Sequence, residues 1–295
     1  MKKNLLFTLL IMLSILVVKG QQPIVTEYDS VLFGETNCPG IWVTIPETSL
    51  ADIQKDWKKV LEKGTKSKVL GKENEMTIFG AQWSDISGEP VNVFSNYAEK
   101  DSAIKLFVAV ELQRDEFVTR DSPQYTALNN MLISFAKDKY ISVAEEQLSQ
   151  ENKKLKDLQK NLESLRKNKD KLENQIKSDQ ITIDQENYRI VNTQKEINET
   201  DQLLDLRGTE LASLDGKERK DKESEIKSLE KKKKNSQKNI ASSESKISKS
   251  TNNIADNNNA IAINLKEQSK VMGNIADQTM VVRKYEEKLN KIKAY

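Results

Sequence analysis

The fold of this chain is decided by residues 176–204, IKSDQITIDQENYRIVNTQKEINETDQLL, in which an isoleucine or leucine returns at every seventh position. A strict seven-residue repeat keeps these side chains on one face of a helix, and such a stripe is buried when the helix supercoils against a second one. No proline interrupts the chain from Val143 to Lys293, so nothing there forces a helix to end. The stretch therefore predicts a coiled coil.

The repeat continues on both sides of an Asp215-Gly216 pair, which is a turn signal. Before the turn, its aliphatic members are Leu148, Leu155, Leu162, Ile176, Ile183, Ile190, Ile197, Leu204 and Leu211, with Lys169 as a polar interruption. After the turn they are Ile226, Ile240, Ile247, Ile254, Ile261, Ile275, Val282 and Leu289, interrupted by Lys233 and Gln268. We therefore expect an antiparallel helical hairpin over residues 141–295, with its turn at 215–218 and arms roughly 100 Å long.

The register of this hairpin can be tested from the sequence. If Leu214 faces Arg219, opposed residues have numbers that add to about 433. Leu172 then meets Ile261 and completes the predicted seam, whereas Ile183 meets Ser250 in the middle. The middle layers thus pair one aliphatic residue with one small polar residue. Three interpretations stay open. The two helices could form a solvated coiled coil that is stable enough alone, the middle of the hairpin could be weak and flexible as part of its role, or a second hairpin could cover the middle in an oligomer.

The first half of the chain has a different composition. All prolines and tryptophans lie before residue 124, which is typical of a compact domain with turns and an aromatic core. We expect a lead-in linker at 21–29 and a small domain at 30–140, with strands at 40–46, 68–70, 76–83, 91–97 and 103–113. A helix at 49–63, capped by Ser49, follows the first strand, and Ser122-Pro123 starts another. The fold class is therefore α+β, in the order β-α-β-β-β-β-α.

This order of elements resembles one repeat of the TATA-box-binding-protein-like fold, which also occurs in exported bacterial proteins of unknown role. The resemblance covers about 110 residues, rests on element order without a diagnostic motif, and implies a curved antiparallel sheet with two helices on one face. It does not imply DNA binding. A ferredoxin-like sandwich with an extra strand is the alternative.

Residues 1–20 have the features of an export signal. Lys2 and Lys3 precede an apolar run from Leu5 to Val18, and the run ends in small residues near Gly20. The run is short for a membrane span, and no later segment approaches the necessary length. We expect a protein exported to a bacterial periplasm and soluble after signal cleavage, with an uncleaved N-terminal anchor as the alternative.

Composition excludes several kinds of chemistry. The chain has no histidine and a single cysteine, Cys38, which removes Ser-His-Asp catalysis, CxxC redox chemistry, an internal disulfide and most zinc sites. The 47 basic and 45 acidic residues nearly balance, whereas a nucleic-acid-binding protein needs a clear positive excess. We therefore expect no catalytic residue, no metal and no cofactor.

These features predict a non-enzymatic scaffold, spacer or adaptor that binds a protein partner through its coiled coil. Lys231, Lys232, Lys233 and Lys234 near the turn could touch an anionic surface, which would make any membrane contact peripheral, or they could form an ordinary solvated face. The alternative function is a periplasmic holdase that resembles prefoldin-like or Skp-type chaperones, a class that predicts homo-oligomers. An enzyme in the N-terminal domain is the second alternative.

Overall fold

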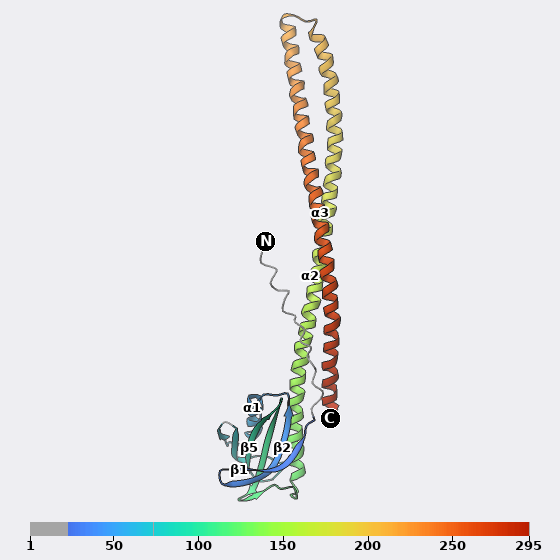
Figure 1. The fold of residues 1–295 in the computed structure, drawn as a ribbon. Helices are drawn as coiled ribbons and strands as arrows, with labels where there is room; N and C mark the ends of the chain where they lie inside the picture. Colours follow the sequence, from blue (N-terminus) through green and yellow to red (C-terminus); the bar gives the residue numbers. More distant parts are fainter. Residues whose placement is uncertain (1–22, 73, 295) are drawn as a thin grey trace. The chain divides into compact units, whose positions relative to one another are not determined.

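A computed structural model describes residues 23–72 and 74–294, so the expected signal peptide at 1–20 lies outside the described residues. The protein is α+β: an antiparallel sheet is followed by two long helices that pack against each other (Figure 1). Contacts divide it into two units. The sheet unit comprises the described residues up to Leu155 together with those from Asp277 onward, and the hairpin unit comprises Lys156–Ala276.

The sheet unit is built on one antiparallel sheet. Its strands are β1 (Thr26–Phe33), β2 (Thr36–Pro46), β3 (Leu70–Lys72), β4 (Glu75–Ala81), β5 (Val91–Lys100), β6 (Ala103–Gln113) and the short β7 (Glu116–Phe117). Their spatial order is β1-β2-β6-β5-β4-β3, and β7 pairs with the end of β6. The five strands expected from the sequence correspond to β2 through β6, with their ends shifted by a few residues.

Two strands were not expected. Strand β1 begins at Thr26, inside the segment predicted as a lead-in linker, and pairs with β2 along its whole length. Its alternation of apolar and polar residues is interrupted at Asp29-Ser30, where two short polar side chains imitate a turn signal. The real turn follows at Gly34, which has φ 62°. Pairing with β2 therefore decides that this polar segment is an edge strand.

One face of the sheet is covered by helices. Helix α1 (Leu50–Leu61) starts where it was expected, because the Ser49 side chain accepts a hydrogen bond from the Asp52 backbone N–H at 3.2 Å. Its Trp57 is fully buried, donates from Nε1 to Ser95 Oγ at 2.9 Å, and packs edge-to-face on Phe135 of helix α2 (Tyr125–Leu211). The main core therefore joins α1, the first turns of α2 and this face of the sheet.

The other face carries a separate apolar cluster that consists of strand residues. Cys38, Phe107 and Ala109 are buried in it, and five half-buried side chains surround them: Val31, Phe33, Trp42, Phe94 and Phe117. We call this surface the open face, because none of these residues comes from a helix. The resemblance to TATA-box-binding-protein-like domains stays a prediction.

The predicted hairpin is confirmed. Helix α2 continues from the sheet unit to Leu211, and helix α3 (Gly216–Ala294) runs back after a short link in which Gly216 has φ 64°. Within the hairpin unit, the cross-helix pair Asp201–Lys233 is 2.6 Å apart, and Asn253 donates to Asp179 at 3.3 Å. Both pairs lie within about one helical turn of the register expected from the sequence.

Candidate functional site

The predicted seam residues lie between the two helices. Every one of them, from Leu148 to Leu289, is buried or half-buried, and Ile197, Val282 and Leu289 are the most buried. Asp215 and Gly216 are exposed at the link between the helices. The seven-residue repeat thus coincides with less exposed positions of both helices, as a seam between them requires.

A second, polar row lines the same seam. Ser236, Ser243 and Ser250 follow one another at intervals of seven on α3, and each is less than a tenth exposed. Asn264 and Gln268 are buried further along the helix. Both aliphatic and polar side chains are therefore buried along α3, and the pairing of isoleucine with serine across the helices stays a prediction.

Glu186 of α2 is the charged centre of this row. Its side chain is 6% exposed, and its carboxylate accepts hydrogen bonds from Ser243 Oγ at 2.7 Å, Lys246 Nζ at 3.0 Å and Arg189 Nη1 at 2.8 Å. The Ser243 hydroxyl and then the Lys246 ammonium hold the pKa of this carboxyl below its ordinary value. Of these donors Lys246 distinguishes the register, because a shift of one heptad would bring another serine to Glu186 but an asparagine, Asn239 or Asn253, in place of the lysine.

Further contacts fix the same register. Asn264 Nδ2 donates to the backbone carbonyl of Leu165 at 3.1 Å, and Asn264 Oδ1 accepts from Gln268 Nε2 at 2.7 Å. Such directional bonds favour one alignment, whereas aliphatic side chains pack nearly as well after a shift of one heptad. The hairpin unit is therefore a rod with a fixed register, about 85 Å long.

Close to the link, four charged residues form a network across the helices. Arg207 contacts Glu225 at 2.9 Å and Glu210 at 2.8 Å, and Lys222 contacts the same carboxylates at 3.1 and 3.0 Å. Lys222 and then Arg207 lower the pKa of Glu210, since both cations favour its charged form. Opposite charges are equal in number here, so the network closes the hairpin without creating a charged patch.

The lysine cluster near the link is only partly available to a partner. Lys231, Lys232 and Lys234 are exposed, and none of them has an ion-pair partner among the described residues. Lys233 is half-buried and bound to Asp201. Three of the four lysines could therefore meet an anionic surface.

The outer surface of α2 carries apolar side chains that the seven-residue repeat does not include. Ile181, Tyr188 and Val191 are each more than half exposed, and Tyr188 reaches 70%. Their spacing of seven and three residues places them on neighbouring positions of one helix face. Leu203 and Leu206 are also exposed further along α2. We call Ile181, Tyr188 and Val191 the outer patch; a search for exposed apolar residues outside the heptad positions could have found it.

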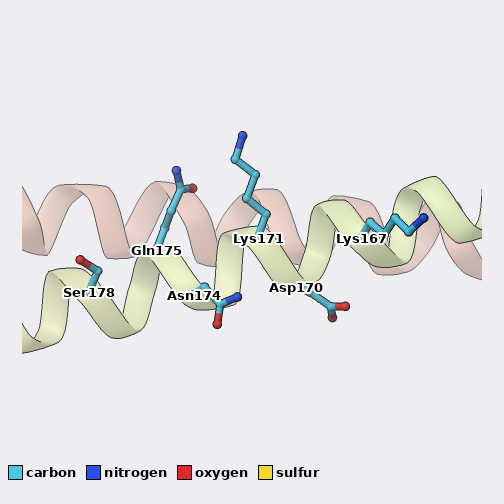
Figure 2. Close-up of a pocket in the computed structure, with 6 residues that line it drawn as sticks. All are labelled: Lys167, Asp170, Lys171, Asn174, Gln175 and Ser178. Atoms are coloured by element: carbon cyan, nitrogen blue, oxygen red, sulfur yellow. The ribbon is translucent and has the colours of Figure 1, made fainter.

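A surface depression also lies on α2, but the side chains that line it do not converge on one point. Figure 2 shows its lining side chains, which all come from this helix and point in different directions: Lys167, Asp170, Lys171, Asn174, Gln175 and Ser178. A binding pocket needs polar groups that converge on one point. These polar side chains spread into solvent, so the depression is an ordinary feature of a charged helix face.

A buried ion pair lies within the sheet unit, where the last turns of α3 meet the end of β2. Lys288 Nζ donates to Glu47 Oε2 and, at 3.1 Å, to Gln147 Oε1, while Tyr140 O–H donates to Glu47 Oε1 at 3.4 Å. The Lys288 side chain is 7% exposed and also lies 5.9 Å from the centre of the Tyr285 ring. This cluster has no local signal in the sequence, because its members are up to 241 residues apart.

The backbone at Glu47 has an uncommon conformation. Glu47 has φ 55°, a left-handed conformation that is uncommon for a residue other than glycine, asparagine or aspartate. The carboxylate is thereby held against Lys288 and Tyr140, and each polar group in the cluster has a partner inside it. This arrangement attaches α3 to the sheet rather than presenting a reactive group.

The described residues contain no candidate metal site and no membrane-spanning helix. Across residues 23–72 and 74–294, no three histidine, cysteine or carboxylate side chains are grouped so that they could hold a metal ion. The same described part contains no helix with the length and apolar character needed to cross a membrane. No protein-family model matches the chain, and no curated protein matches it.

Proposed function

We propose that this protein is a non-enzymatic scaffold or adaptor that binds a protein partner through the outer surface of its hairpin. The observation that carries this proposal is the outer patch: Ile181, Tyr188 and Val191 project apolar surface from a rod whose register is fixed by buried polar contacts. Exposed apolar side chains on an otherwise charged helix are a feature of interaction sites.

The fixed register supports an adaptor more than a simple spacer. Side chains on two helices keep constant relative positions only if the helices cannot slide, and the Glu186–Lys246 and Asn264–Leu165 contacts oppose sliding. A partner could therefore recognise a pattern that extends over both helices. A spacer would need length alone, without buried polar groups that weaken the seam.

The proposed location is outside the bacterial cytoplasm, and it rests on the sequence of residues 1–20. In that setting the exposed Lys231, Lys232 and Lys234 could add a peripheral contact with an anionic surface. We propose this contact as an auxiliary one, because Lys233 is already bound to Asp201.

A holdase is the second candidate, and the same outer patch favours it. Exposed apolar groups on helical arms could hold many unfolded clients in place of one partner. The two functions differ in selectivity: an adaptor binds one folded partner in a fixed orientation, whereas a holdase suppresses the aggregation of unrelated unfolded proteins.

The test uses a triple variant of the full chain, Ile181→Ser, Tyr188→Ser and Val191→Ser, because serine removes apolar surface and leaves the seam unchanged. Leu32→Ser is the control, since Leu32 is also exposed but belongs to the sheet unit. Crosslinking with mass spectrometry in intact cells should give one recurrent partner for the wild type and the control, and lose it in the triple variant.

Two results would reject the adaptor. If the triple variant keeps the same crosslinked partner, the outer patch is not the binding surface. If the purified wild type suppresses the aggregation of several unrelated unfolded proteins and the triple variant does not, the holdase replaces the adaptor.

A further inference from the structure

The open face of the sheet differs from the usual exposed face of a two-layer domain. An antiparallel sheet with helices on one side commonly presents polar side chains on the other. Here the second face carries interlocked aromatic rings: the ring centre of Phe107 lies 5.2 Å from that of Trp42, and the centre of Phe33 lies 5.5 Å from that of Phe94. A cluster of this kind is typical of an interaction surface, because aromatic residues are enriched at the centres of protein interfaces.

The cluster continues outward into fully accessible side chains. Phe79 and Leu70 are each more than half exposed. The Phe79 ring centre lies 6.2 Å from that of Phe94, and Leu70 pairs with Thr77, which in turn pairs with Phe94. Since residues directly opposed in neighbouring strands point to the same face, Leu70 extends the same surface. The apolar side chains of the open face therefore extend from β1 to β3, with Thr77 between Phe94 and Leu70.

Close packing at the centre makes this area rigid. A side chain at Gly40 would meet the Phe107 ring at 2.7 Å, so Phe107 lies directly over this glycine. Cys38 is fully buried beside it, and burial, with the Glu111 carboxylate nearby, raises the pKa of its thiol to about 11. The thiol is therefore a neutral packing group, and it is also a single chemical reporter inside this face, because the chain has only one cysteine.

The charges of this face are divided between its two ends: Lys100 and Lys105 lie at one end of the β5–β6 pair, where Lys105 is bound to Glu27, and carboxylates lie toward the other end. Glu111 lies on the same face as Phe117, and its carboxylate accepts from Asn92 Nδ2 at 2.7 Å and from the Asp115 N–H at 3.0 Å. Asp29 shares the face on β1, and Glu35 lies in the turn after Phe33. Among the described residues, no lysine or arginine forms an ion pair with Glu111, Asp29 or Glu35. A ligand for this surface should therefore be positively charged as well as apolar.

This charge pattern selects between kinds of occupant. Nucleic acid is disfavoured because phosphates would meet uncompensated carboxylates. A second copy of the chain would have to meet these carboxylates with Lys100 and Lys105 of its own open face, and Lys105 is already bound to Glu27 at 2.7 Å, so a separate segment with free cations is the better match. A polypeptide segment in which lysine or arginine stands beside apolar side chains satisfies both the rings and the carboxylates.

We infer that the open face is a second docking surface of this protein, for a basic and apolar segment of a partner protein. Phe79, Phe94 and Leu70 receive the apolar side chains of that segment, and Asp29, Glu35 and Glu111 receive its cations. This surface is independent of the outer patch on the hairpin, so the protein has two docking surfaces and can connect two proteins.

The probe for the test is a fluorescent peptide of roughly ten alternating leucine and lysine residues, long enough to cross several strands. It is added to the full chain, and its fluorescence anisotropy is measured at low and at physiological salt. Two matched peptides serve as controls, one with glutamate in place of lysine and one with serine in place of leucine. The leucine–lysine peptide should bind at least about tenfold more tightly than either control.

Variants locate the binding. Phe79→Ser and the double variant Asp29→Lys with Glu35→Lys change exposed positions, and each should weaken binding of the leucine–lysine peptide about tenfold. Tyr188→Ser and Glu218→Lys are matched changes on the hairpin and should leave it unchanged. Bound peptide should also slow the reaction of Cys38 with a thiol reagent, because this buried thiol reacts only when the face opens and a bound segment opposes that opening.

Several outcomes would overturn the inference. The first is equal binding of the lysine and glutamate peptides. The second is equal binding of the leucine–lysine peptide to the wild type and to the Asp29/Glu35 variant. The third is loss of binding in the hairpin variants alone. Absence of binding to the wild type would also overturn it. Self-association through this face, seen as a dimer that Phe79→Ser abolishes, would assign the surface to a second copy instead.

Discussion

The sheet unit and the hairpin unit bury their side chains in different ways. Trp57, Ile53 and Leu61 have no exposed surface in the sheet unit, whereas most seam residues of the hairpin unit are only half-buried and alternate with serine, asparagine and glutamate. Apolar burial stabilises the first unit strongly at a few places. The second unit depends on many weak layers, and its polar contacts contribute alignment more than stability.

This difference indicates what each unit provides. A sheet with a complete core on one face can present a rigid apolar surface on the other. A two-helix rod has almost no interior, so nearly all of its surface is open to partners. Substitutions in the two units should therefore differ in effect, and those in the core of the sheet unit should have the largest.

Replacement of Trp57 by alanine should destabilise the sheet unit by about 3–5 kcal/mol, because it leaves a cavity and removes the hydrogen bond to Ser95. All tryptophans lie in the sheet unit, so the remaining two report on its unfolding. Denaturant unfolding followed by tryptophan fluorescence should shift strongly, and the helical circular dichroism signal should shift less. Coincident shifts in both signals would show that the two units unfold as one.

Glu47→Ala should destabilise the sheet unit by about 3 kcal/mol, because Lys288 is left buried without its carboxylate. Alanine keeps the left-handed backbone strain, so the loss reports on the ion pair. Chemical denaturation of the double variant Glu47→Leu with Lys288→Met should show most of the stability restored. If the single variant is as stable as the wild type, the pair does not anchor α3 to the sheet.

Ser250→Ile should stabilise the hairpin by about 1 kcal/mol, because it replaces a buried polar side chain by an aliphatic one. Ser243→Ile should give a smaller gain, since it also removes a hydrogen bond from the buried carboxylate of Glu186. Thermal melting followed by circular dichroism measures both changes. Equal gains would mean that the Glu186 contact contributes nothing to the seam.

The change at Asp56, in the sheet unit, has an expected effect no larger than that of Ser250→Ile. Hydrogen bonds from Lys139 and then Lys59 lower the pKa of this carboxyl from 3.8 to about 2. A depressed folded-state pKa gives stability that is present above pH 3.8 and is lost as the pH falls through about 2. Because the group lies near the surface, screening limits the contribution to about 1 kcal/mol. Asp56→Asn should therefore cost that amount at neutral pH and almost nothing at pH 2, measured by denaturation at each pH.

The parts that could be predicted from the sequence are those encoded by local periodicity. The seven-residue repeat identified both long helices and the side chains between them, and Ser49 marked the start of α1. The register followed from the turn at Asp215-Gly216, because a short link leaves little freedom in how the helices align.

The remaining features depend on contacts between distant segments. Strand β1 is recognisable only once β2 is available to pair with it. Along β6, Lys105 and Glu111 lie on the face away from the helices, but Phe107 and Ala109 lie on that face too and join Phe33 and Phe94 from other strands. The Glu47–Lys288 pair has no local signal at all. The open face therefore appears only when the sheet has been assembled.

The central claim is that the outer patch of the hairpin binds a partner, and a photoreactive amino acid at Tyr188 tests it most directly. After illumination of intact cells, the account predicts one discrete crosslinked species, which disappears when Ile181→Ser and Val191→Ser are added and which the same amino acid at Leu32 does not give. Absence of that species at position 188, or its persistence in the doubly substituted chain, would contradict the claim.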